Sequence, residues 1–229
     1  MHFSFVGLAL AMMVTSTMAK PRGPYLISVT GKTNSSINGY VKACNAGVAQ
    51  EGLCYDSSQV PEDSSFYQFY HEAGLDAKSR RASYLVFNLL VKAESGLQSL
   101  PSAVRLEPTL GSNVNVAFIP VGVNKPTPFS VAANGSVYAT GLADDRSWNE
   151  TRPEPDGADR QAANFQVCWQ WVGAYWYHAI GWATSLPPQN PSCEPVDLKL
   201  VDLVPPSSTR AMDRTPTDLP GSENDKVGR

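Results

Sequence analysis

The chain has 229 residues, of which 42% are hydrophobic and 17% charged, and its formal net charge is −3. Its lysines and arginines do not gather into a basic stripe, so nucleic-acid binding has no electrostatic support. Removal of an N-terminal leader would leave about 210 residues, which is enough for one domain with its own hydrophobic core.

Residues 1–19 predict a secretory signal peptide. Residues 3–14 form an apolar run that is shorter than the roughly 20 residues needed to span a bilayer. Thr17 and Ala19 place small residues where a signal peptidase would cleave before Lys20. The rest of the chain offers neither a second candidate span nor the hydrophobic tail of a lipid-anchor signal. We therefore expect a secreted protein, in the extracellular medium or the cell wall, with no membrane association after cleavage.

Most of the chain after the leader has the alternation or the short apolar runs of β-strands. The strands predicted before the main hairpin span residues 25–30, 37–43, 65–71, 84–92, 103–107, 114–121, 129–133 and 136–140, and the last strand spans 196–203. Residues 84–92 form the longest apolar run, which indicates a central strand covered on both faces. Asn134-Gly135 predicts a type I′ turn between two of the strands.

These strands predict one all-β domain over residues 20–204. Their spacing of about ten residues, without a convincing helical period, is typical of a β-sandwich or a small β-barrel of roughly ten antiparallel strands. A β-trefoil is the alternative, because threefold repeats can diverge beyond recognition.

Residues 165–182 predict a tight β-hairpin with a fixed register. Gly173-Ala174 supplies a two-residue loop, and glycine at the first loop position suits a type II′ turn. Pairing outward gives one face with Trp171/Trp176, Trp169/His178, Val167/Ile180 and Phe165/Trp182, and a second face with Val172/Tyr175, Gln170/Tyr177, Cys168/Ala179 and Gln166/Gly181. We expect the first face to point inward and the second outward.

The four cysteines are Cys44, Cys54, Cys168 and Cys193. An even number in an oxidising compartment implies two disulfides, for which three connectivities are possible. We favour Cys44–Cys54 with Cys168–Cys193, because each closes a local loop. The spacings lack the close cysteine pairs of a zinc ribbon, and we expect no metal and no cofactor.

Three Asn-x-Ser/Thr sequons begin at Asn34, Asn134 and Asn149. All three fall in predicted turns or loops, where a glycan can be accommodated. We therefore expect a glycoprotein.

Two segments are polar and lack a strand pattern. Residues 141–163 form a long acidic loop of the kind that is usually functional or disordered. Its acids are interleaved with arginines, which favours a solvated loop. A Ca²⁺ site and a pair of catalytic carboxylates are the alternatives. Residues 205–229 are rich in Pro, Ser, Thr and Asp, which predicts a disordered polar tail.

No catalytic motif stands out. The chain after the leader has two histidines, His71 and His178, and no nucleophile elbow, zinc-protease, P-loop or dinucleotide fingerprint. We interpret His178 as a structural imidazole in the hairpin and His71 as a surface residue. The catalytic residues, if there are any, are not identifiable from the sequence.

Aromatic residues give the remaining indication of a binding surface. Tyr175, Tyr177 and Gln170 share the hairpin face expected to point outward, and Trp148 lies in the acidic loop. Exposed aromatic rings of this kind can stack on sugar rings. The competing interpretation is that the tyrosines are ordinary strand residues.

Two blocks of sequence resemble a family of small secreted, cysteine-containing proteins of filamentous ascomycete fungi with no established function. The first block is NGYVKACNAG at 38–47 followed by EGLC at 51–54; the second contains Cys168, Gly173, Tyr175, Tyr177, Trp182 and PQNPSC at 188–193. Together they bracket residues 24–203. The resemblance implies a secreted, disulfide-linked, β-rich fungal domain and brings no catalytic residues.

The leading hypothesis is therefore a non-catalytic module that associates with the cell wall or binds glycans such as cell-wall polysaccharide. A secreted glycan hydrolase or lyase, with its site near residues 141–163, is the first alternative. An effector-like secreted protein is the second.

Overall fold

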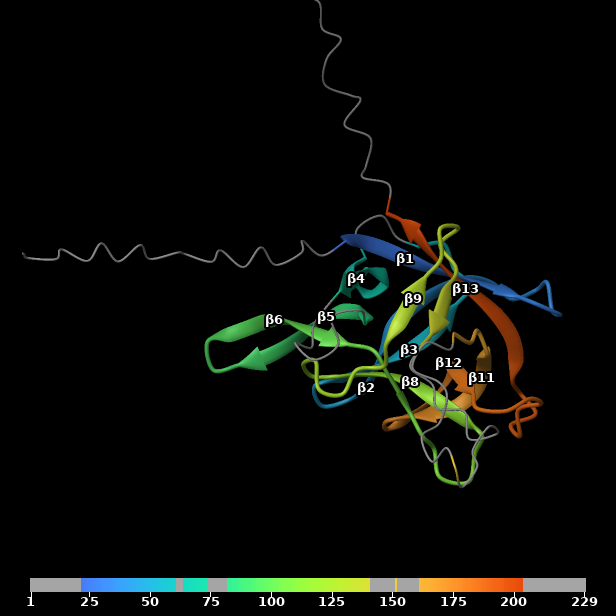
Figure 1. Ribbon diagram of the computed structural model, residues 1–229. Helices are drawn as coiled ribbons and strands as arrows, with labels where there is room; N and C mark the ends of the chain where they lie inside the picture. The colour runs from blue at the N-terminus through green and yellow to red at the C-terminus, as the bar shows by residue number, and fades with distance from the viewer. Residues whose placement is uncertain (1–21, 61–63, 74–81, 141–150, 152–160, 204–229) are drawn as a thin grey trace, which may run out of the picture.

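The computed structural model describes residues 22–60, 64–73, 82–140, 151 and 161–203, and in this part of the chain it is all-β (Figure 1). Its one helical element is a single 3-10 turn, η1 (Ser65–Tyr67). The strands form an antiparallel sheet of 11 strands and a separate two-stranded sheet. The predicted all-β fold is confirmed.

Seven strands close into a barrel-like ring. These are β1 (Arg22–Gly31), β2 (Asn38–Gly47), β3 (Gln50–Asp56), β8 (Val114–Pro120), β12 (Tyr175–Ala183), β11 (Phe165–Val172) and β13 (Glu194–Asp202). Each pairs antiparallel with the next in this order, and β13 pairs back onto β1 over seven residue pairs. The ring therefore leaves no free edge between its first and last strands. This closed ring corresponds to the small β-barrel of the prediction.

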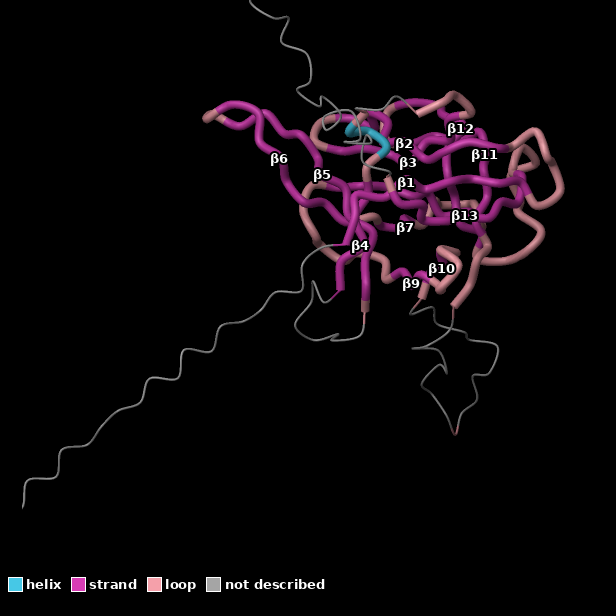
Figure 2. The backbone as a smooth tube through the Cα atoms, turned by 90° about the horizontal axis from the view of Figure 1, so that it is seen from above, coloured by secondary structure: helices cyan, strands magenta, loops and turns pink. Residues whose placement is uncertain are grey.

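The remaining strands extend or cover this ring. They are β4 (Phe69–Ala73), β5 (Ser83–Ala93), β6 (Gly96–Ala103), β7 (Arg105–Glu107), β9 (Phe129–Val131) and β10 (Val137–Ala139). The strands β4, β5 and β6 continue the sheet from β1, and the β5–β6 hairpin projects from the body as an arm (Figures 1 and 2). The strand β9 pairs with β10 from Val131 opposite Val137, but the turn between them is not the predicted type I′ turn. That turn requires positive φ at both Asn134 and Gly135, whereas only Gly135 has it, with a φ of 84°. The Gly135 N–H instead donates to the Ala132 carbonyl at 2.9 Å.

The hydrophobic core lies inside the ring, because alternate residues of each ring strand point to the interior. The ring strands supply Ile27, Val29, Val41, Ala43, Leu53, Ala117, Ile119, Phe165, Val167, Ile180, Trp182, Val196 and Leu198 to one buried cluster. Residues from the extension, including Phe69, Phe87 and Phe129, complete the same cluster. Within the part of the chain that is described, no helix is long and apolar enough to cross a membrane.

Both favoured disulfides are confirmed. Cys44–Cys54 and Cys168–Cys193 join Cα atoms that lie 5.8 and 4.1 Å apart. The segment between the first pair is a hairpin of β2 and β3 rather than the predicted loop, with Cys44 opposite Gly52 in the register. Two disulfides are compatible with an extracellular protein.

Two strand predictions need correction. Residues 65–71 were expected to form one strand, but η1 occupies the start of that range and β4 begins at Phe69. The strand β5 is covered on both faces only over Tyr84–Phe87, where four consecutive residues are buried. Beyond Asn88 it enters the projecting arm, and alternate residues are exposed. The predicted signal peptide and polar tail lie outside the described residues.

Candidate functional site

The predicted hairpin of β11 and β12 has the expected register. All eight predicted pairs are present, from Phe165 opposite Trp182 to Val172 opposite Tyr175. Gly173 has a φ of 59°, the positive value that the first position of a type II′ turn requires. The turn and the two-residue alternation therefore determine which side chains share a face.

The expected orientation of the two faces is wrong in the outer half of the hairpin. Trp169, Trp171 and Trp176 were expected to point inward, yet they are 55%, 53% and 63% exposed. Gln170 was expected to point outward, yet it is only 7% exposed, and Val172 is fully buried. Only the base of the first face, residues Phe165, Val167, Ile180 and Trp182, lies in the barrel core.

The orientation follows from what the outer half of the hairpin packs against. Its second face lies on the β2–β3 hairpin, where Val172 joins Cys44, Ala46, Cys54, Val116, Phe118 and Ala179 in a second buried cluster. The Ala174 N–H donates to the Ala46 carbonyl at 3.1 Å, and the Tyr177 hydroxyl donates to the Asn45 carbonyl at 3.0 Å. Burial of this second face leaves the tryptophan face in solvent.

A groove of about 330 Å³ lies beside the exposed tryptophans. We call it the tryptophan groove, and it is lined by Thr109, Gly111, Ser112, Val114, Val116, Trp169, Gln170, Trp171, Trp176, Gln189 and Asn190. Trp171 and Trp176 pack edge to face, with ring centroids 5.8 Å apart and an interplanar angle of 80°. The groove thus combines exposed indole rings with neutral hydroxyl and carboxamide groups.

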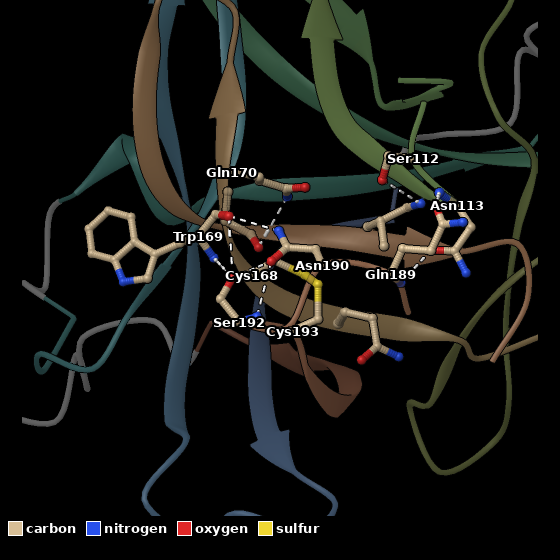
Figure 3. The surroundings of a disulfide bond; sticks show 12 residues. Ser112, Asn113, Cys168, Trp169, Gln170, Gln189, Asn190, Ser192 and Cys193 are labelled. Carbon is tan, nitrogen blue, oxygen red and sulfur yellow. Dashed lines mark hydrogen bonds between the residues drawn. A yellow bond between two sulfur atoms is a disulfide. The ribbon is translucent and has the colours of Figure 1, made fainter. Parts of the chain in front are cut away.

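The carboxamide wall of the tryptophan groove is held by hydrogen bonds around the Cys168–Cys193 disulfide (Figure 3). Asn190 Nδ2 donates to the Trp169 carbonyl at 2.9 Å, and the Gln189 N–H donates to Asn113 Oδ1 at 2.7 Å. The Trp169 indole points away from Gln189 and Asn190 in this view. Trp169 lines the groove together with Trp171 and Trp176.

The same wall is tied to the loop that precedes β8. Asn113 Nδ2 donates to the carbonyls of Ser185 and Pro187, both at 3.1 Å. Because every atom of the Asn113 carboxamide is used in this way, the side chain holds the loop in position rather than facing a ligand. Gln189 Oε1 in turn accepts from the Asn113 N–H at 3.2 Å.

A second groove of about 620 Å³ lies next to the first. We call it the paired-charge groove, and it is lined by Gln50, Arg105, Glu107, Pro108, Thr109, Leu110, Val116, Phe118, Pro120, Trp171 and Gly173. Arg105 Nη2 and Glu107 Oε1 form an ion pair along β7. Thr109, Val116 and Trp171 line both grooves.

Trp169 belongs to a row of aromatic rings at the end of the barrel. Its indole stacks on the His178 imidazole at a centroid distance of 5.6 Å, and His178 meets Tyr55 edge to face at 5.5 Å. Burial lowers the pKa of His178 below its ordinary value, because water is partly excluded from the charged form. The interpretation of His178 as a structural imidazole agrees with this packing.

The most strongly perturbed carboxyl group, Asp56, lies outside both grooves. Burial by itself would raise its pKa, but hydrogen bonds from Lys42, Ser58 and Tyr67 outweigh burial and hold the pKa of Asp56 well below its usual range. The Tyr67 hydroxyl donates to Asp56 Oδ2 at 2.8 Å, and the Ser58 N–H donates to Oδ1 at 2.9 Å. This cluster ties η1 to β2 and β3 and has a structural role.

The tyrosines predicted as a ligand surface do not line either groove. Tyr175 is 46% exposed, whereas Tyr177 is half-buried and its hydroxyl is bonded to the main chain. Gln170 does line the tryptophan groove, but from a buried position in which its Nε2 donates to the Ala179 carbonyl at 3.3 Å. Trp148 lies outside the described residues. The structure therefore brings Gln170 together with the tryptophans instead of with the tyrosines.

Two of the three sequons lie in described turns. Asn134 is exposed in the β9–β10 turn, and its Oδ1 accepts from the Ser136 N–H at 3.1 Å. Asn34 is half-buried, and its Oδ1 accepts from the N–H and hydroxyl of Ser36 at 3.1 and 2.6 Å. In both turns the oxygen is engaged and the nitrogen that would carry a glycan is not part of these bonds. Asn149 lies outside the described residues.

The acids proposed for a hydrolase site cannot be placed. Asp144, Asp145, Glu150, Asp156 and Asp159 all lie outside the described residues. His71 is half-buried on β4, which is not adjacent to the strand β12 that carries His178. Among the described residues, no group of three or more His, Cys, Asp or Glu side chains could hold a metal ion.

The sequence prediction missed most of the residues that form the tryptophan groove. Thr109 and Ser112 come from a loop that carries no motif, and Gln189 and Asn190 come from the PQNPSC block of the resemblance, which gave them no role. The two loops meet where β8 pairs with β12. One signal could have indicated an exposed face. Both faces of the hairpin carry apolar side chains, and the rest of the protein could cover only one of them along its whole length.

Comparison with known proteins yields no relative: no family model, curated protein or solved structure matches the chain.

Proposed function

We propose that this protein is a secreted, non-catalytic glycan-binding module of the cell wall whose ligand lies in the tryptophan groove, stacked on Trp171 and Trp176. One observation carries the proposal: the indoles of Trp171 and Trp176 are each more than half exposed and line a groove that also contains neutral hydrogen-bonding side chains. Large aromatic side chains are normally covered in a soluble protein, and a cluster of exposed ones marks a binding surface.

The chemistry of the groove matches the two surfaces of a sugar ring. The C–H groups of a pyranose form an apolar patch that packs against the face of an indole, while the hydroxyls at its edge exchange hydrogen bonds with carboxamides and hydroxyls. Gln189, Ser112 and Thr109 provide such polar groups in the tryptophan groove. The groove combines apolar rings and uncharged polar groups in the way that a glycan requires.

The predicted cellular location supports the same proposal. The signal-peptide pattern, the two disulfides and the three sequons indicate export, and the resemblance to small secreted fungal proteins indicates a fungal cell-wall environment. A secreted protein in that environment meets polysaccharide at high concentration.

The first test is depletion from solution by insoluble polymers. Purified protein lacking residues 1–19 is incubated with chitin, β-glucan, cellulose and fungal cell-wall fractions, and the protein left in solution is measured. We expect selective depletion by one polymer, and a loss of depletion in Trp171→Ala and Trp176→Ala. Tyr175→Ala is the matched control, because Tyr175 is an exposed aromatic residue of the same hairpin that lines neither groove.

Three outcomes would contradict the proposal. The first is no depletion by any polymer. The second is unchanged depletion in both tryptophan variants. The third is a loss of depletion in Tyr175→Ala alone, which would return the binding surface to the tyrosine face.

A hydrolase or lyase remains the alternative prediction, and an effector-like role the next. Glycoside hydrolysis generally uses a pair of carboxylates, whereas the described lining of the two grooves contains one, Glu107, which is paired with Arg105. Release of soluble sugar from the bound polymer would favour the enzyme. Expression confined to growth on a host would favour the effector-like role.

A further inference from the structure

We infer that the tryptophan groove and the paired-charge groove act as one binding surface for an extended, electrically neutral polysaccharide chain. This inference rests on the proposed function and adds the class of ligand: a linear polymer bound along several sugar units, rather than a mono- or disaccharide or a charged glycan.

The continuity of the two grooves is the first argument. Thr109, Val116 and Trp171 line both the groove of about 330 Å³ and the groove of about 620 Å³, so the two grooves are neighbours on the surface. Val116 belongs to β8, which pairs with β12 and β3 along one edge and with β7 along the other. A ligand stacked on Trp171 can therefore extend into either groove without leaving the protein surface.

The size of the combined surface is the second argument. The two grooves are open to solvent rather than enclosed. Sites for small molecules usually bury most of the ligand in a closed concave cavity. An open path with a tryptophan in its middle suits the interior of a long chain, whose ends continue into solvent.

The charge of the lining residues is the third argument. Among the described residues, Arg105 and Glu107 are the only charged ones that line either groove, and they form an ion pair with each other. The described lining therefore has no net charge with which to attract a polyuronate or a deacetylated amino-sugar polymer. The binding of an uncharged polysaccharide does not depend on charged side chains, because its hydroxyls form hydrogen bonds with neutral donors and acceptors.

The second groove offers contacts of its own beyond Trp171. Leu110 is fully exposed at the turn after β7, and Gln50 is exposed at the start of β3. Both line only the paired-charge groove. These two side chains therefore report whether a ligand reaches the second groove.

The experiment is isothermal titration of the protein with soluble oligosaccharides of increasing length, prepared from the polymer that depletes it. We expect the affinity to rise with length beyond the trisaccharide before it reaches a plateau. Leu110→Ser and Gln50→Ala should each weaken binding of the longest oligosaccharide by about three- to tenfold and leave the shortest bound oligosaccharide unaffected. Trp171→Ala should weaken binding at every length.

The control variant is Leu97→Ser, which removes an exposed leucine from β6 on the projecting arm (Figure 1). It should bind all lengths as the unsubstituted protein does. Binding should also be the same at about 0.1 M and about 1 M NaCl, across which ionic contacts are strongly screened.

The possible failures are distinguishable. If no oligosaccharide of any length binds, the proposed function fails and this inference fails with it. If short oligosaccharides bind, the affinity does not rise with length, and Leu110→Ser and Gln50→Ala are silent, the glycan site stands and the extended surface is refuted. A marked weakening of binding at high salt, or a preference for a polyuronate or a deacetylated polymer, would refute the neutral ligand.

Discussion

The contact between Gly52 and Val172 offers a direct test of how the tryptophan hairpin is held. Gly52 lies on β3, and a Cβ at that position would clash with Val172 Cγ1 and come within 3.3 Å of Cys44 Sγ. Val172 itself is fully buried next to the hairpin turn. The absence of a side chain at Gly52 is therefore what allows the second face of the hairpin to reach the β2–β3 hairpin.

The expected magnitudes follow from this packing. Gly52→Ala overpacks the contact and should lower the free energy of unfolding by about 1–3 kcal/mol. Val172→Ala removes two buried methyl groups at about 0.8 kcal/mol each and leaves a small cavity, for a total of about 2 kcal/mol. The double variant lacks the Cγ1 atom with which the new methyl group clashes, so it should be about 1–2 kcal/mol more stable than the sum of the two single effects predicts.

The assay is urea unfolding followed by tryptophan fluorescence and by circular dichroism. Free energies come from the midpoint and slope of each curve, and coincidence of the two probes tests two-state behaviour. Val48→Ala is the control for valine truncation, because Val48 is almost fully exposed and its loss should change stability by less than about 0.5 kcal/mol. If Gly52→Ala and Val172→Ala are additive within about 0.5 kcal/mol, the docking contact described here is refuted.

Two further predictions concern protonation. Because hydrogen bonds hold the pKa of Asp56 below its usual range despite burial, its stabilising contribution is complete above about pH 4 and declines as the pH falls below that value. Asp56→Asn should lower the free energy of unfolding at about pH 7 by roughly 1.5 kcal/mol. It should also make the free energy of unfolding depend less on pH below about 4. Urea titrations at several pH values measure this, and an unchanged pH dependence below about 4 would contradict the prediction. The pKa of His178, lowered by burial, should move up toward its ordinary value of about 6.5 in Trp169→Ala, because the stacked indole is removed. Titration of the imidazole signals by NMR measures this pKa, and no upward movement would show that the burial comes from elsewhere.

The local features of this fold were predictable because they depend on neighbouring residues. The Gly173-Ala174 turn sets the register of β11 and β12. Asn134-Gly135 correctly indicated a hairpin of β9 and β10, although its turn is not the predicted type I′. The pairing Cys44–Cys54 closes a short loop and was chosen correctly on that basis. The residues between these two cysteines form a hairpin of β2 and β3 rather than a loop. Ala46 and the two cysteines pack there with Val116 and Phe118 of β8 and Val172 of β11, which are distant in the sequence.

The candidate site was less predictable than the fold. The hairpin was recognised as the aromatic element of the chain, and Gln170 proved to line the groove, but Ser112, Gln189 and Asn190 were not anticipated. Ser112 lies in a turn without a motif, and the PQNPSC block gave Gln189 and Asn190 no role. Their meeting depends on the pairing of β8 with β12, in which the paired residues are 65 to 69 positions apart in the chain. Strand order between distant segments leaves no periodic signal in a single sequence.

Local sequence patterns specify the strand content, the register of the β11–β12 hairpin, the division of its side chains into two faces, and the cysteine pairs that close local loops. Alternation with a period of two specifies which residues share a face, but it does not say which face is covered when both are apolar. That choice was made by the tertiary structure. The barrel interior covers one face as far as Val167 and Ile180, and beyond that point the β2–β3 hairpin covers the other. Trp171 and Trp176 lie beyond the part of the hairpin that the barrel core covers, and they are therefore exposed. The proposed function depends on this exposure.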